Sequence, residues 1–128
     1  MAKRMNVSSG APWENLVGYS RAVRVSNIIE VSGTAPVIDG KTYAPGDAYE
    51  QAKCCIQIIE KALKQAGADL HDVIRTRMFV TDISKWEEFG KAHGEFFGNV
   101  KPATTMVEVK SLISPDMLIE IEVTAIVD

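Results

Sequence analysis

The chain has 128 residues, of which 46% are hydrophobic and 24% charged, and its formal net charge is −3. This length fits one domain with its own core, so we expect 1–128 to be a single domain in which 1–16 is an irregular lead-in. The acidic balance and the lack of a lysine or arginine run argue against nucleic acid as a partner, because phosphate neutralisation drives such binding.

Cysteine and histidine spacing gives no sign of a metal site. Cys54 and Cys55 are adjacent in a predicted helix, where neighbours point about 100° apart and do not chelate one ion. The two histidines are well separated, so we expect no metal, no cofactor and two small thiols that are buried or half-buried. Because no stretch has the length and apolarity of a membrane span or a leader, we expect no membrane contact and a cytoplasmic location.

The first predicted elements form a β-hairpin. Residues 19–25 alternate in polarity, Ser26 and Asn27 supply a tight turn, and residues 28–32 return as a β-branched strand that ends at Gly33.

A long amphipathic helix is predicted next. Asp47 and Glu50 have the spacing of a capping box, and Gly67 is placed to end the helix in the left-handed conformation. Between them, apolar residues recur at intervals of three and four over about five turns: Ala52, Cys55, Ile56, Ile59, Leu63 and Ala66.

The rest of the chain predicts a strand at 73–81, a shorter helix and two final strands. Ser84 to Glu87 reads as a second capping box that opens the helix, and Gly98 closes it. The final strands are expected at 103–110 and 118–127.

The predicted order ββαβαββ indicates an α/β (α+β) fold, a mixed β-sheet with two helices on one face. The other face would expose a large apolar patch, and this short chain has no third helix to cover it. We therefore expect copies of the chain to associate through their sheets.

Three segments of the chain together resemble the Rid family, also called the YjgF family and, in older usage, endoribonuclease L-PSP. The segments are Gly18–Arg24 with Val31–Thr34, Thr76–Asp82, and Pro102–Ala103 with Val107–Val109 and Leu118–Glu122. The resemblance runs from about Tyr19 to Val127, and the order and separation of the segments make it specific.

The resemblance implies a chorismate-mutase-like fold assembled as a homotrimer, with clefts for a small-molecule ligand between subunits. It also implies hydrolysis of reactive enamines or imines to a 2-oxo acid and ammonia, with no cofactor or metal.

The resemblance also assigns roles to individual residues. Tyr19 matches a tyrosine that lines the cleft, Ser32 and Gly33 match a Ser-Gly pair beside the ligand, and Trp86 stands where an aromatic wall is common. Glu120 matches the carboxylate that positions water or moves a proton, which makes it the expected catalytic residue.

The chain departs from the family pattern at Thr104, where deaminases have an arginine that anchors the substrate carboxylate. A hydroxyl cannot replace that planar, two-bond contact, so Thr104 would offer one hydrogen bond to a neutral ligand. Arg21 or Arg77 could supply the missing cation, or both could pair with strand carboxylates instead.

Three functions stay open at this point. The first is a cofactor-free hydrolase in which Glu120 handles the proton; alternation puts this residue on the same strand face as Glu122, which would also suit a solvated acidic pair. The second is a non-catalytic ligand-binding or chaperone-like trimer. The third, a ribonuclease, is disfavoured by the acidic charge and the lack of a histidine pair.

Overall fold

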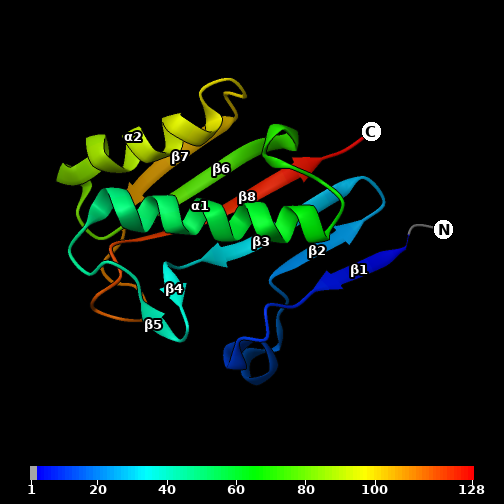
Figure 1. Cartoon of the computed structure of the whole chain (residues 1–128), viewed down its shortest axis with the longest axis horizontal. Helices are drawn as coiled ribbons and strands as arrows, with labels where there is room; N and C mark the ends of the chain where they lie inside the picture. The colour runs from blue at the N-terminus through cyan, green and yellow to red at the C-terminus, as the bar shows by residue number, and fades with distance from the viewer. Residues whose placement is uncertain (1–2) are drawn as a thin grey trace.

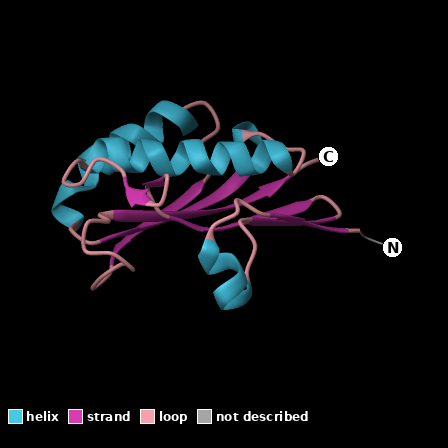
Figure 2. Cartoon of the chain, turned by 60° about the horizontal axis from the view of Figure 1, so that its bottom comes forward, coloured by secondary structure: helices cyan, strands magenta, loops and turns pink. Residues whose placement is uncertain are grey.

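The computed structural model describes residues 3–128, which form a six-stranded mixed sheet with two α-helices on one face (Figures 1 and 2). The elements in chain order are β1 (Arg4–Val7), η1 (Glu14–Gly18), β2 (Ala22–Val25), β3 (Ile28–Thr34), β4 (Val37–Ile38), β5 (Lys41–Thr42), α1 (Ala48–Gln65), η2 (Leu70–Asp72), β6 (Val73–Val80), η3 (Ile83–Lys85), α2 (Trp86–Phe97), β7 (Ala103–Glu108) and β8 (Ile119–Ile126).

The sheet order is β1-β2-β3-β8-β6-β7, and β4 and β5 form a separate small hairpin. Only β6 and β7 of this sheet pair in parallel, since α2 provides the crossover between them; the other pairs are antiparallel. The last strand, β8, is therefore inserted between β3 and β6, at the centre of the sheet (Figure 1). The predicted mixed sheet and the predicted element order are confirmed from residue 19 onward, apart from the added β4–β5 hairpin.

The prediction of an irregular lead-in over 1–16 was wrong for its first part. Arg4–Val7 forms β1, which pairs antiparallel with β2 and extends the sheet by one edge strand. Residues Glu14–Gly18 form a short π-helical turn, η1. A four-residue edge strand with one buried side chain, Val7, carries no alternation long enough to reveal it in the sequence.

The predicted hairpin of β2 and β3 is present, with Ser26 in its turn at a φ of 56°. The register of β3 against β8 shifts between Val31 and Thr34. A β-bulge at this point places Ser32 and Gly33 opposite a single residue of β8 and turns the end of β3.

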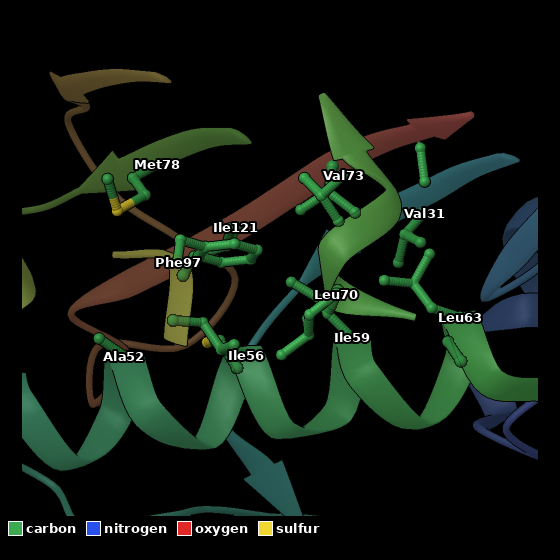
Figure 3. Close-up of a cluster of buried hydrophobic side chains, with 14 of the residues drawn as sticks. Val31, Ala52, Ile56, Ile59, Leu63, Leu70, Val73, Met78, Phe97 and Ile121 are labelled. Atoms are coloured by element: carbon green, nitrogen blue, oxygen red, sulfur yellow. The ribbon is translucent and has the colours of Figure 1, made fainter. Parts of the chain in front are cut away.

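Helix α1 follows its predicted signals closely. The Asp47 side chain accepts a hydrogen bond from the Glu50 amide, and Gly67 follows the helix with a φ of 86°. The predicted apolar stripe is buried, and both cysteines are buried free thiols. Figure 3 shows Ile56, Ile59 and other side chains of this stripe packed toward sheet residues such as Ile121.

The second predicted capping box was wrong. Asp82, not Ser84, is the capping residue: its carboxylate accepts hydrogen bonds from the Ser84 amide and hydroxyl at the start of η3. Lys85 stands at the N-cap of α2 and makes no side-chain cap. The aspartate two residues earlier competes better for the free amides because it carries a full charge.

The two faces of the sheet differ in what covers them. Alternate residues of the central strands are buried under α1 and α2. Within residues 3–128 neither α-helix covers the opposite face, and the short turn η1 lies on that side (Figure 2). That open face carries both charged residues and exposed apolar ones: Val25, Ile28, Val107 and Ile126. Within residues 3–128, no helix has the length and apolarity needed to cross a membrane.

One buried polar side chain, Gln51, connects α1 to two loops. It is 0% exposed, and its Nε2 donates to the carbonyl oxygens of Ala44 (3.3 Å) and Asp116 (2.9 Å). Its Oε1 accepts from the Leu118 amide at 2.8 Å, at the entry to β8. The apolar periodicity of α1 gave no hint of this role.

Replacing Gln51 with leucine should lower the free energy of unfolding by about 1–3 kcal/mol, because the Leu118 amide and two carbonyl groups lose their partner. Urea unfolding at fixed protein concentration measures the change. The matched control is Gln57→Leu on the exposed side of the same helix, which should change stability by less than about 0.5 kcal/mol. Equal effects of the two variants would contradict the assigned role.

Candidate functional site

A cavity of about 770 Å³ lies where the N-terminal segment, the end of β3, helix α1 and the start of β8 meet. Tyr19, Arg21, Gly33 and Glu120 all line it. Three of these four are residues to which the sequence assigned a role, and the fourth, Arg21, was one of two candidate cations. One chain forms this cavity by itself.

Gly33 and Glu120 lie close together in the cavity. A Cβ atom placed on Gly33 would overlap the Glu120 Oε2 atom, and it would also lie 3.0 Å from Cδ of the same carboxylate. The bulge in β3 brings this backbone toward β8, and only glycine leaves room for the carboxylate there. Gly33 therefore permits this position of the Glu120 side chain, and a larger residue would require the carboxylate to move.

Arg21 binds the same piece of backbone. Its Nη2 donates to the Gly33 carbonyl oxygen at 2.5 Å, and its guanidinium carbon lies 5.9 Å from the centre of the Tyr19 ring. Arg21 immediately precedes β2, and the first residue of that strand, Ala22, is buried under the helices. Alternation then directs the arginine to the opposite side, beside Glu120.

The electrostatics of Glu120 suit proton transfer. Burial raises the pKa of Glu120 above its ordinary value; the positive charge of Arg21 opposes this shift, and the negative charge of Glu122 adds to it. The pKa of this carboxyl group is thus moved toward neutral pH, which is the direction a general acid or base requires.

No sequence pattern pointed to Glu14, which is buried in η1 near the cavity. Its carboxylate accepts hydrogen bonds from the amide and the hydroxyl of Ser9. Burial pushes the pKa of Glu14 up, but hydrogen bonds from Ser9 and Ser8 and the charge of Arg21 leave it below the ordinary value. Glu14 therefore stays ionised and holds the turn that forms one wall of the cavity.

Two residues expected at the cleft lie outside the lining of this cavity. The Ser32 hydroxyl donates to the backbone oxygen of Ser20 at 2.6 Å, so it ties the two strands of the hairpin together. Trp86, at the start of α2, is 57% exposed and does not line the cavity.

Thr104 lies on the helix side of β7, whereas Glu120 faces the open side of the sheet. The Oγ1 atom of Thr104 is 2.8 Å from Oγ1 of the buried Thr76. The same Thr76 atom is 2.9 Å from Nε2 of His93 on α2. Burial lowers the pKa of His93, which favours the neutral ring. Within one chain, the residue in place of the family arginine is thus not joined to the cavity.

Arg77, the other candidate cation, has a carboxylate partner. Its Nη1 lies 3.6 Å from Oε1 of Glu122, directly across from it on β8, and both side chains are partly exposed. This is the strand-pairing alternative that the sequence left open for Arg77. Among residues 3–128, no three histidine, cysteine or acidic side chains are grouped so as to hold a metal ion.

Comparisons with known proteins agree on the family. The chain matches the family model described as Endoribonuclease L-PSP over residues 10–127. It is 38% identical to a RutC family protein of Pyrococcus abyssi, with 98% of both chains covered. It is 32% identical to the 3-aminoacrylate deaminase RutC of Acinetobacter baylyi, over 94% of this chain and 95% of the relative.

The solved structures give the same result. A member of the YjgF/YER057c/UK114 family from Mycobacterium tuberculosis superposes with a TM-score of 0.90 at 48% identity, over 98% of this chain and 100% of the other. The YjgF gene product of E. coli superposes with a TM-score of 0.79 at 27% identity, over 94% of this chain and 93% of the other. The fold is therefore the expected chorismate-mutase-like fold, and the chain belongs to the Rid/YjgF family, also described as the endoribonuclease L-PSP family.

Proposed function

We propose that this protein is a cofactor-free hydrolase of small enamines or imines, with Glu120 as the catalytic residue. The observation that carries the proposal is the position of Glu120: half-buried in the cavity, packed on Gly33 and beside Arg21. The relative named 3-aminoacrylate deaminase supports a deaminating reaction, since that name describes removal of an amino group from an enamine.

The chemistry needs one group that exchanges a proton. An imine gains a water molecule at carbon, and the resulting carbinolamine loses ammonia to leave a carbonyl compound. Glu120 would first pass a proton from the attacking water to the imine nitrogen. It would then pass the hydroxyl proton of the carbinolamine to the leaving nitrogen, so that it ends the cycle as it began. The Tyr19 ring would cover one side of the substrate in the cavity.

The assembly we propose is a homotrimer that forms through the open sheet face, with additional clefts between subunits. The exposed apolar residues on that face, among them Ile28 and Val107, would then be covered, as the core face is by the helices. In such an assembly a neighbouring copy could bring Trp86 or Thr104 to a cleft that one chain leaves incomplete. The location we propose is the cytoplasm.

A second candidate function is a ligand-binding trimer without turnover. The observation that favours it is Thr104, which contacts Thr76 and the Pro102 carbonyl oxygen in place of the arginine implied by the family. Such a protein would bind the same small carbonyl or imine compounds in the cavity and release them unchanged.

The trimer predicts a molar mass near three times the 14.0 kDa of one chain, measured by light scattering during size exclusion. Val107→Asp, which puts a charge on the open face, should lower that mass because an unpaired charge at an interface is costly. Ile38→Asp, on the β4–β5 hairpin, is the equally exposed control and should leave the mass unchanged. A monomer at micromolar concentration would rule the assembly out.

Catalysis predicts that the protein accelerates ammonia release when it is added to a threonine or serine dehydratase with its substrate. Glu120→Gln should reduce that acceleration by about 100-fold or more, because the proton-exchanging group is lost. Glu122→Gln, two residues along the same strand face, is the matched control and should retain activity.

The second candidate predicts no acceleration by the natural chain. Activity that appears only in Thr104→Arg would show that a cleft between subunits is competent but lacks its carboxylate anchor. Ligand binding that survives Glu120→Gln, with no turnover in either form, would establish the binding function instead.

The raised pKa of Glu120 predicts a pH-dependent stability difference. The folded state binds a proton at this group more tightly than the unfolded chain does, so its contribution is present at acid pH and is lost as pH rises through the folded pKa. Glu120→Gln should therefore stabilise the protein, relative to the natural chain, more at about pH 7 than at about pH 4. Urea unfolding at both pH values and equal protein concentration tests this; the reverse order would contradict a raised pKa.

A further inference from the structure

The guanidinium of Arg21 has more donors than the surrounding protein uses. An arginine presents five N–H donors, and within residues 3–128 only Nη2 of Arg21 donates a hydrogen bond, to the Gly33 carbonyl. The Nε–H is buried without a hydrogen-bond partner in the same range. Arg21 also forms no ion pair with the described residues, although its charge is felt by both Glu14 and Glu120.

The other cations are less suited to hold an anion in the cavity. Arg77 is paired with Glu122 and does not line the cavity. Lys61 lines it from an exposed position on α1, where water screens its charge. A partly buried arginine with unused donors, next to an apolar ring and a glycine backbone, is the arrangement that binds a planar anion.

We infer that Arg21 binds the carboxylate of a small organic acid in the cavity, and that this binding makes Glu120 take up a proton. The inference rests on the proposed function and assigns the residue that would hold a substrate carboxylate in this chain. The anion anchor would thus stand on the residue before β2, two residues from Tyr19, and not at position 104.

The coupling follows from the charges around Glu120. Arg21 is the positive group that favours its ionised form, while Glu122 opposes that form. The thiol of Cys55 on α1 and the carboxylate of Glu14 on η1 are the other titratable groups whose interactions with this pair are resolved. The negative charge of a ligand carboxylate on Arg21 would offset the favourable positive charge, so a proton would move onto Glu120. A substrate would thereby load the acid that its own leaving nitrogen needs.

Isothermal titration with pyruvate tests both parts. The natural protein should bind pyruvate more tightly than the neutral amide pyruvamide, and titrations in buffers of different ionisation enthalpy at about pH 6 should show proton uptake. Arg21→Gln should weaken pyruvate binding by about 30-fold or more and abolish the uptake, while binding pyruvamide as the natural chain does. Arg77→Gln, the matched control, should leave pyruvate affinity unchanged.

Arg21→Lys guards against a folding defect, since it keeps the charge: it should retain part of the pyruvate affinity at an unchanged circular dichroism spectrum. Equal pyruvate affinity of Arg21→Gln and the natural chain would overturn the inference, and so would a natural chain that binds no pyruvate. Either result can coexist with ammonia release in the dehydratase assay, so the inference can fail while the proposed function stands. If pyruvate binding depends on Arg21 but no ammonia is released, the inference stands and the proposed catalytic function fails.

Discussion

The contact of the Glu120 carboxylate with the Gly33 backbone is the constraint on which the site depends. The bulge in β3 brings Gly33 toward β8, the missing side chain leaves space for the carboxylate, and Arg21 donates a hydrogen bond to the Gly33 carbonyl. This packing buries the Glu120 carboxylate and puts it near the charge of Arg21. The shifted pKa of Glu120 follows from both effects. The cavity walls, by contrast, come from segments outside the sheet, η1 and α1 among them.

Local signals predicted the helices and central strands well, because each needs only neighbours in sequence. Asp47 and Gly67 bound α1 as their chemistry requires. The failures occurred where two local signals competed or where none existed: Asp82 displaced Ser84 as a cap, and β1 is an edge strand held by pairing with β2. Neither outcome depends on hydrophobic periodicity, the property that the sequence displays most clearly.

For the site, family resemblance named Tyr19, Gly33 and Glu120, which the fold brings to one cavity. Trp86 and Thr104 were named by the same reasoning and lie elsewhere in the single chain. The bulge that brings Gly33 to Glu120 joins segments that are far apart in the sequence. The hydrogen bond from Ser9 to Glu14 forms in a segment without regular periodicity. Alternation places a side chain on a face of a strand, but it does not say which neighbour reaches it.

His93, Thr76 and Thr104 form a row of hydrogen bonds. This row makes position 104 a hydrogen-bond acceptor, whereas an arginine there would be a donor. Each hydroxyl has a single hydrogen. If the His93 ring accepts, Thr76 donates to it and Thr104 donates to Thr76; if the ring donates, Thr104 is left to donate to the Pro102 carbonyl. In both arrangements the hydrogen of Thr104 is used inside the protein, and the outer side of this oxygen presents only lone pairs. Where an arginine would present hydrogen-bond donors, this edge of β7 presents an acceptor.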